Sequence, residues 1–396
     1  MASPNEVNHA NEFTVSVVRD VDGLTAHEAA WEALVPDAIE PNVFYEPWML
    51  IPALRAFGPG PDLRIVFVYA PDPARPDGPS LLCGVFPLQR QSRWKGLPAP
   101  ALSFLTHKYC FLTIPLIRTV VAKQTLAALF KWLTTSPEGT PLLEFTLIAG
   151  EGSFHRLLVD EMYTGGRLSF VSDCYTRAFM KMHSGADAYL QASIKGDRRR
   201  EIRRRERLLS EQGEVKYAAL QNEDDPEAWL REFLRIEAAG WKGREGTALA
   251  CRKEDEQYFL NIAREGHRRG RLLMHALHVG ISPVAFNCYF RAGSGCYYFK
   301  PTFREEYAQF GPGRLLEVET IRRLHSMPEL QWADSCTAPD NELLNSLWME
   351  RRTIMSLCVS TGRTPGDLVV SLSPALRWIK QKLRRGDNHV NRERGL

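Results

Sequence analysis

The sequence lacks the features that mark membrane-spanning and exported chains. No run of about 18 apolar residues occurs, so we expect no transmembrane helix. The segment from Met1 to Phe13 is polar and contains Glu6 and Glu12, whereas a signal peptide needs a basic start and an apolar stretch. We therefore expect a cytoplasmic protein whose residues 1–12 form a disordered leader.

The chain also lacks the cysteine spacing of a metal or disulfide protein. Its eight cysteines are scattered, and none belongs to a Cys-x-x-Cys pair. This favours buried thiols in a reducing compartment over a disulfide framework or a zinc site. His275 and His278 are a poor ligand pair, because residues three apart on a predicted strand point to opposite faces. We expect no metal.

Two widespread catalytic motifs are missing as well. The sequence contains no Walker phosphate loop and no Gly-x-Ser-x-Gly nucleophile elbow. Gly293-Ser294-Gly295 falls between two predicted strands and is best interpreted as a turn. These absences exclude no fold, but they remove the commonest nucleotide-hydrolysing and serine-hydrolase chemistries.

Strong overall charge is absent too, since the net charge is only +3. Basic character is confined to two segments. Residues 195–207 hold eight basic and three acidic residues, and residues 366–396 hold seven basic and three acidic residues. A general polyanion-binding surface is therefore not expected, and neither is a nucleic-acid partner.

The composition that is present is that of a folded globular protein, with 44% apolar and 24% charged residues. A length of 396 residues favours two domains. Strand-like and helix-like runs alternate, so we predict a mixed α/β (α+β) fold. The predicted division is an N-terminal domain at 13–180, a C-terminal domain at 181–365 and a basic tail with an amphipathic helix at 366–396.

The second half shows a regular order of predicted elements. In chain order we predict a long helix at 187–211, a strand at 215–220, helices at 225–239 and 254–269, strands at 271–279, 283–291 and 295–300, a helix at 312–325, a strand at 330–334, a helix at 340–353 and a last strand at Val369 and Val370.

One local arrangement carries chemistry: Gly311-Pro312-Gly313-Arg314 at the predicted start of a helix. A helix start exposes unpaired backbone N–H groups and carries about half a positive charge, which suits a diphosphate. Gly311 and Gly313 allow close approach to the backbone, and proline is tolerated in the first turn. The alternative reading is a loop-to-helix boundary without a ligand.

Two helices, three antiparallel strands, this turn, a helix, a strand and a helix form the element order of the GNAT acetyltransferase fold. Residues 180–355 further resemble the CelD-type acetyltransferases, a GNAT branch linked to polysaccharide synthesis. The matching pieces are Tyr189-Leu190, Lys195, Arg198 to Arg207, Glu237 to Gly243, Gly246 to Leu249, Pro283 to Phe286, Tyr298 to Lys300, Pro312 to Leu316 and Asp334.

The resemblance implies tandem GNAT-like domains, each a mostly antiparallel twisted sheet flanked by helices. It implies an enzyme that transfers an acyl group, expected to be acetyl, directly from acyl-CoA to an amine or hydroxyl of a sugar, polysaccharide precursor or small metabolite. The residues expected to bind CoA are Phe286, Asn287, Gly311, Pro312, Gly313, Arg314 and Leu315. A backbone N–H near Asn287 would polarise the thioester carbonyl.

Catalytic candidates follow from the same resemblance. Tyr298 and Tyr307 are candidates for the acid that protonates the leaving thiolate, and Glu306 and Asp334 for the base. Candidate acceptor contacts are Trp241, Lys242 and Lys300. Each has a structural alternative: the tyrosines could simply pack, Glu306 could be solvated, Asp334 could orient a loop, Lys300 could form an ion pair, and Trp241-Lys242 could wedge the domains together.

Alternatives also stay open for the basic segments and for the whole chain. The arginines at 198–205 could be a solvated helix face or could contact the CoA 3′-phosphate or RNA. The tail around 373–385 could pack on the core or lie on an anionic membrane. For the whole chain, the alternatives are a Fem-like transferase that uses aminoacyl-tRNA and a catalytically silent binding protein.

Overall fold

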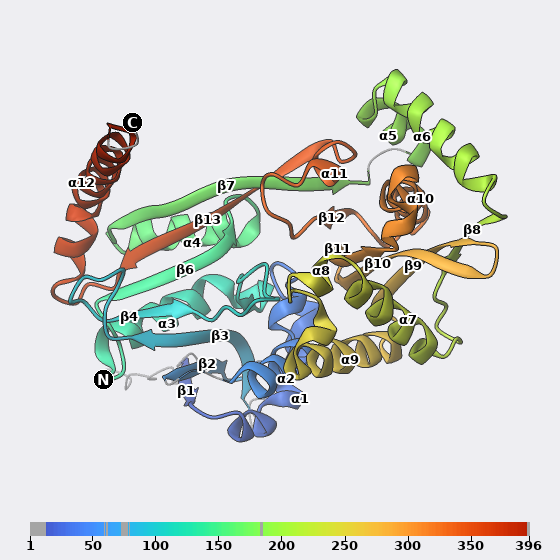
Figure 1. Cartoon of the computed structure of the whole chain (residues 1–396). Coiled ribbons are helices and arrows are strands. Elements are labelled where there is room, and N and C mark those ends of the chain that lie inside the picture. The colour runs from blue at the N-terminus through green and yellow to red at the C-terminus, as the bar shows by residue number, and fades with distance from the viewer. Residues whose placement is uncertain are drawn as a thin grey trace, which may run out of the picture.

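The computed structural model describes residues 13–58, 60, 62–72, 78, 80–182 and 185–393. The predicted leader at 1–12 lies outside the described residues. Helices and one large sheet alternate along the chain (Figure 1), which confirms the prediction of a mixed α/β fold with a mostly antiparallel sheet.

The sheet has 13 strands among the described residues. They are β1 (Thr14–Val18), β2 (Leu63–Ala70), β3 (Leu81–Gln91), β4 (Ala101–Phe104), β5 (Leu116–Ile117), β6 (Leu142–Ala149), β7 (Ser169–Lys181), β8 (Val215–Ala219), β9 (Leu272–Val279), β10 (Ser282–Ala292), β11 (Gly295–Phe303), β12 (Trp332–Asp334) and β13 (Glu350–Ser360). Their spatial order is β1-β2-β3-β4-β6-β13-β7-β12-β11-β10-β9-β8, with β5 beside β3.

The helices are α1 (Glu28–Leu34), α2 (Pro47–Phe57), α3 (Ala122–Thr135), α4 (Ser153–Thr164), α5 (Ala186–Ser193), α6 (Gly196–Ser210), α7 (Pro226–Ala239), α8 (Trp241–Arg244), α9 (Lys253–Arg268), α10 (Pro312–His325), α11 (Glu342–Asn345) and α12 (Gly366–Glu393). A short 3-10 turn, Glu305–Phe310, precedes α10.

The two halves of the chain repeat one order of elements. In the first half, β1 to β4 form an antiparallel meander with α1 and α2 between its first two strands, and α3 leads to β6, which runs parallel to β4. In the second half, β8 to β11 form the same meander with α7 and α9 between its first two strands, and α10 leads to β12, parallel to β11. This duplication is what tandem domains require.

The strands that end the two halves, β7 and β13, connect the two halves of the sheet. β13 pairs with β6 and β7, so it completes the first half of the sheet, and β7 pairs with β12 of the second half. The two sheets expected from the sequence are therefore joined into one. The proposed boundary at 180/181 falls at the end of β7.

Apolar packing divides the sheet into two faces. One large core extends through both halves and includes Trp48 of α2, Phe259 of α9 and Phe290 of β10. A second core lies between the other face of the second half and α5, α6 and α10, with Tyr189 and Leu316 among its members. The helix α10 is thereby fixed on the sheet directly after the Gly311 turn.

Three local predictions in the second half need correction. The helix expected at 187–211 is two helices, because Ile194 and Lys195 have extended backbone angles between α5 and α6. The helix expected at 340–353 is only α11, followed by β13. Val369 and Val370 lie in α12 and not in a strand.

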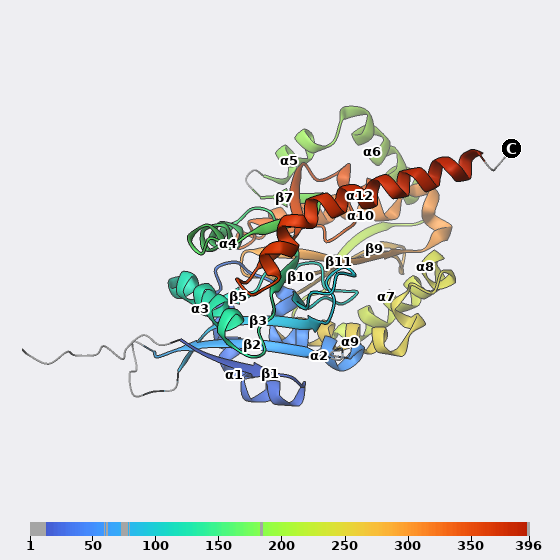
Figure 2. The ribbon, with the colours of Figure 1, turned by 90° about the vertical axis from the view of Figure 1, so that its left-hand side faces the viewer.

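The helix α12 follows β13. Its root packs against the first half through Val370, which shares a small core with Trp94 and Cys358. Figure 2 shows the rest of the helix extending away from the body of the protein. No helix in the described part of the chain combines the length and the apolarity needed to cross a membrane.

Candidate functional site

The start of α10 has the geometry expected from the Gly-Pro-Gly sequence. Gly311 adopts a left-handed conformation (φ 65°, ψ 49°), which a residue without a Cβ takes readily. Pro312 begins the helix, and no side chain caps this end. Within the described residues, the N–H of Gly313 has no hydrogen-bond acceptor. An anion could therefore bind to free backbone donors here.

Arginines surround this helix start. A Cβ on Gly311 would lie 3.0 Å from Nη1 of Arg205, which comes from the neighbouring helix α6. Burial lowers the pKa of Arg314, and the nearby charges of Arg198 and Arg205 lower it further. In the described part of the chain, neither Arg198 nor Arg314 forms an ion pair. Arg205 is paired with Glu201 at 2.7 Å, so the positive charge that no ion pair offsets is that of Arg198 and Arg314.

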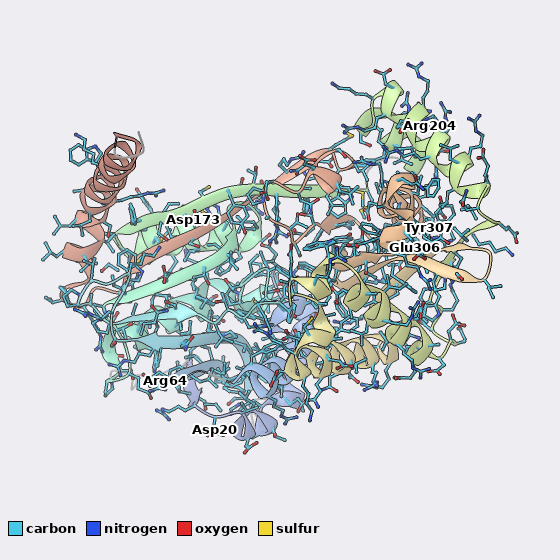
Figure 3. All side chains as sticks on the ribbon, viewed as in Figure 1. Asp20, Arg64, Asp173, Arg204, Glu306 and Tyr307 are labelled. Carbon is cyan, nitrogen blue, oxygen red and sulfur yellow. The ribbon has the colours of Figure 1, made fainter. Side chains whose placement is uncertain are left out.

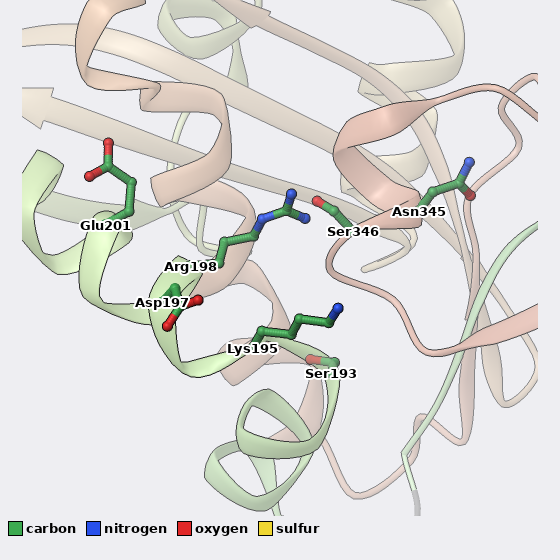
Figure 4. A pocket seen from close by; sticks show the side chains of 7 residues that line it. All are labelled: Ser193, Lys195, Asp197, Arg198, Glu201, Asn345 and Ser346. Atoms are coloured by element: carbon green, nitrogen blue, oxygen red, sulfur yellow. The ribbon is translucent and has the colours of Figure 1, made fainter.

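A cavity of about 570 Å³ opens beside this cluster, lined from α6 by Lys195 and Arg198 and from the end of α11 by Asn345 and Ser346. Figure 4 shows Arg198 extending from α6 toward Ser346. Arg314 reaches the same place, because its Nη1 donates to Ser346 Oγ at 2.7 Å. Asp197 and Glu201 line the cavity as well, so its wall carries charges of both signs. The contact of Arg314 with Ser346 connects this cavity to the start of α10.

The first half has no equivalent of this turn. The corresponding helix, α3, begins at Ala122 after a short turn at Thr119–Val121. No glycine stands at its start, and Arg118 just before it is paired with Asp37. In the described structure, the start of α10 thus combines a glycine turn with arginines that form no ion pair, and the start of α3 does not.

The strand before the turn has a partly open edge. β11 pairs with β12 only from Gly295 to Tyr297, although β11 continues to Phe303. The outer edge of β11 beyond Tyr297 therefore has no strand partner in the described sheet. A register shift opposite Cys288/Tyr289 leaves Phe299 as an extra residue in β11. Such a bulge next to an unpaired edge can aim a backbone N–H at a ligand.

The position of Asn287 corrects one expectation. β10 lies between β9 and β11 and pairs with both of them across Asn287, so its backbone is occupied by the sheet. Its side chain donates to Glu317 Oε2 at 2.8 Å. Phe286 points to the opposite face, where it packs against Phe233. The open edge of β11, and not β10, supplies the backbone that could face a thioester.

Tyr298 belongs to a buried polar cluster beneath α10. It is 3% exposed, and its hydroxyl lies 3.5 Å from Oδ1 of Asn287. At the centre of the cluster is Glu317, which accepts hydrogen bonds from Tyr289 at 2.9 Å and from Trp348 at 2.9 Å. Burial raises the pKa of Glu317 to about 8, against the opposing effect of these bonds. The cluster fixes α10 on the sheet, and its burial favours this structural role for Tyr298.

Asp334 also lies in a buried network. Its carboxylate accepts from Arg177 Nη2 at 2.8 Å and from Arg352 Nη1 at 3.0 Å, and it caps the Cys336 N–H at 3.0 Å. Burial alone would raise the pKa of Asp334, but the two guanidinium charges outweigh it and lower the pKa. A fully buried carboxylate with a lowered pKa is a poor proton acceptor, so the geometry favours a structural role over the expected base.

Glu306 and Tyr307 lie in the turn that leads into α10, and Figure 3 labels both. The side chain of Glu306 is 67% exposed and lies 3.6 Å from Arg304. Tyr307 is half-buried, with its ring 6.4 Å from that of Phe310. Of the four catalytic candidates, these two are the ones that solvent and substrate can reach.

The acceptor candidates meet at a buried carboxylate that the sequence did not single out. Glu237 is 1% exposed, and its Oε1 lies 3.0 Å from Lys300 Nζ and 3.5 Å from Lys242 Nζ. Burial lowers the pKa of Lys242 to about 8. Trp241 is 44% exposed, and its ring lies 5.9 Å from Lys242 Nζ at the edge of this triad of Glu237, Lys242 and Lys300. Lys242 and Lys300 therefore both pair with Glu237, which agrees with the structural alternative of an ion pair. With a pKa of about 8, Lys242 is partly deprotonated just above neutral pH.

A second cavity, of about 560 Å³, lies where the two halves meet. Phe57 of α2, His107 and Lys108 after β4, and Arg252 before α9 line it. Tyr109, next in sequence, places its ring 5.6 Å from Lys300 Nζ. Tyr109 therefore lies between a residue that lines this cavity, Lys108, and the lysine that pairs with Glu237. In the described part of the chain, no group of three or more His, Cys, Asp or Glu residues could hold a metal ion.

Comparison with known proteins identifies the class of fold. The acetyltransferase (GNAT) domain family model matches residues 196–341, which span α6 to the start of α11 and include the Gly311 turn. No curated protein matches the chain.

Two solved structures share the fold over most of the chain. The crystal structure of FemX aligns with a TM-score of 0.55 at 11% identity, covering 84% of this chain and 95% of FemX. A conserved protein of unknown function from Bacteroides thetaiotaomicron aligns with a TM-score of 0.54 at 10% identity, covering 88% of this chain and all of the other. Residues 196–341 therefore match the GNAT acetyltransferase domain model, and the chain shares its fold with FemX.

Proposed function

We propose that the chain is an acyltransferase that takes an acyl group, expected to be acetyl, from acyl-CoA. The observation that carries this proposal is the uncapped, glycine-flanked start of α10 among Arg198, Arg205 and Arg314. A diphosphate would accept from the Gly313 amide and from the guanidinium groups, and would neutralise charges that now repel one another. The match of this region to the GNAT domain supports the same reading.

The proposed reaction is direct transfer. The acceptor nitrogen or oxygen attacks the thioester carbon, the C–S bond breaks, the acceptor loses a proton to a base, and the thiolate receives a proton. A backbone N–H on the open edge of β11 beyond Tyr297 would donate to the thioester carbonyl and polarise it. We assign the acid to Tyr307 and the base to Glu306, since both are accessible beside the donor site.

For the acceptor, we propose an amine or hydroxyl of a sugar, a polysaccharide precursor or a small metabolite, as the CelD-type resemblance implies. The acceptor would enter from the cavity between the halves, which Lys108 lines one residue before Tyr109, the ring that lies 5.6 Å from Lys300 Nζ. Two lysines around one carboxylate leave a net positive charge, which suits an acceptor with an anionic group.

Thermal unfolding with and without acetyl-CoA tests the donor site. Ligand at 100 times its dissociation constant should stabilise the fold by about 2.7 kcal/mol. Gly313→Asp should abolish this shift, because its carboxylate repels the diphosphate while the site has room for a side chain, the nearest atom being 3.9 Å from a Cβ. The control is Val120→Asp, at the exposed corresponding start of α3. Unchanged CoA affinity in Gly313→Asp would falsify the donor site.

The arginine cluster has a matched test on one helix. Arg198→Ala should weaken acetyl-CoA binding about 10- to 100-fold, the value of a hydrogen bond to a charged group. Arg204→Ala is the control, because Arg204 lies on the outer side of α6 (Figure 3) and pairs with Glu201 at 2.7 Å. Equal weakening in both variants would indicate only a long-range charge effect.

A Fem-like transfer from aminoacyl-tRNA is the second candidate, favoured by the FemX fold and by the exposed arginines of α6. It predicts salt-sensitive tRNA binding and no stabilisation by any acyl-CoA. In that case, both Arg198→Ala and Arg204→Ala should weaken binding of tRNA. Acetyl-CoA binding without thiol release across a panel of amine and hydroxyl acceptors would instead favour a silent binding protein.

A further inference from the structure

The helix α12 has two different apolar surfaces. Its root is buried through Val370 and Ser373, which lie 3% and 5% exposed against the first half. A second set of apolar residues on the same helix does not contact this core: Leu368, Leu372 and Leu376 are 61%, 49% and 41% exposed. Packing on the protein therefore explains one face of α12 and leaves the other without a partner among the described residues.

The exposed leucines form a continuous stripe. They are four residues apart, and at about 100° per residue such positions lie one above another along a helix. In the sequence, Ile379 and Leu383 follow three and seven residues after Leu376, which is also helical spacing. Figures 1 and 2 show that α12 runs out from the body, and Leu368, Leu372 and Leu376 are all exposed along its first turns. Scattered exposed leucines need no explanation, but an aligned row of them does.

Basic positions flank this stripe on both sides. By helical spacing, Lys380 and Arg384 fall on one side, and Lys382 and Arg385 fall on the other. Trp378 is 57% exposed, and its ring lies 4.2 Å from Lys382 Nζ. An apolar stripe between two rows of cations, with an exposed tryptophan, is the pattern of a helix that lies in a lipid–water interface.

We propose that α12 binds the surface of an anionic lipid bilayer, with the Leu368–Leu372–Leu376 stripe in the acyl-chain boundary and the flanking lysines and arginines at the headgroups. Charge decides between this occupant and a second copy of the chain. Residues 366–396 carry seven basic and three acidic residues, so two such helices would repel each other, whereas anionic lipid attracts them. The proposal is independent of the acyl donor, since α12 lies outside the GNAT-matching region.

Vesicle flotation of the full chain tests this proposal. Vesicles of phosphatidylcholine with one third phosphatidylglycerol should carry the protein, and vesicles of phosphatidylcholine alone should not. Binding should weaken as salt is raised, because the electrostatic part is screened. Leu372→Asp with Leu376→Asp should abolish binding, while Lys380→Glu with Lys382→Glu should reduce it and flatten its salt dependence.

The control is Ile281→Asp, since Ile281 is 99% exposed in the β9–β10 turn, at the opposite end of the molecule from α12 in Figure 1. It should bind anionic vesicles as the wild type does. Leu372, Leu376, Lys382 and Ile281 are exposed positions, and an unaltered melting temperature would show that each variant folds. Equal binding to neutral vesicles, full binding by the leucine variant, or a dimer in solution that Leu372→Asp dissociates would each overturn the proposal.

Discussion

Replacing Asp334 with asparagine tests the buried ionic network that joins the two halves. Asp334 of β12 pairs with Arg177 of β7 at 2.6 Å and with Arg352 of β13 at 3.0 Å, and its side chain is 0% exposed. In Asp334→Asn, Arg352 keeps its partner Glu40 at 2.7 Å. Arg177 has no second carboxylate in the described structure, so a buried charge is left uncompensated.

Breaking a buried ion pair from one side costs about 3–5 kcal/mol, and we expect Asp334→Asn to lose that much stability in urea titrations at pH 7. Because the folded-state pKa of Asp334 is lowered, its contribution is present above about pH 4 and is lost as pH falls through the folded-state pKa. The difference from wild type should therefore be constant between pH 5 and 8 and shrink in acid.

A surface pair provides the control. Glu329→Gln removes a carboxylate that lies 2.9 Å from Arg291 but is 47% exposed, so its loss should cost less than about 1 kcal/mol. If Asp334→Asn were as stable as Glu329→Gln, the reasoning on the network would be refuted. An Asp334→Asn variant with wild-type stability but without acyl transfer would instead support Asp334 as the catalytic base.

Three further substitutions test other contacts. Gly295→Ala should lose about 1–3 kcal/mol in thermal unfolding, because its Cβ would overlap the indole of Trp332, whereas Gly313→Ala has room and should fold normally. Glu237→Gln should lose about 3 kcal/mol in urea and lower the pKa of Lys242 below 8, since two lysines then share no anion; unchanged stability would contradict the triad. Burial lowers the pKa of His275 to about 3, so wild-type stability should fall by roughly 2 kcal/mol between pH 6.5 and pH 5, and His275→Gln should remove that part of the loss.

Local signals in the sequence predicted the parts of the fold that short segments determine. The helix expected at 312–325 is confirmed as Pro312–His325, because glycine and proline define its start within the segment itself. The helix at 225–239 is likewise confirmed as α7, where the Asp225 side chain accepts from the Glu227 N–H. The meander of β9 to β11 followed from glycine turns between apolar runs.

Long-range contacts explain what the sequence did not predict. From the sequence alone, the start of β13 was predicted to continue a helix. It forms a strand because β6 and β7 leave a place between them. Arg205 lies next to Gly311, although the two are far apart in the sequence. Their proximity results from the packing of α6 on α10, which the sequence did not predict. The role of Glu237 depends on Lys300 in the same way. The arginine-rich run was the available signal for the cationic site, but sequence alone could not orient it.

The exchange of the final strands has a consequence for how the polypeptide is completed. Since β13 occupies the place between β6 and β7, the first half keeps a gap in its sheet until residues 350–360 have been synthesised. Cutting the gene between the repeats would leave unpaired edges on both products, at β6 and β7 in the first and at β12 and β13 in the second. Two separately made pieces should therefore be insoluble alone and recover only when they are produced together.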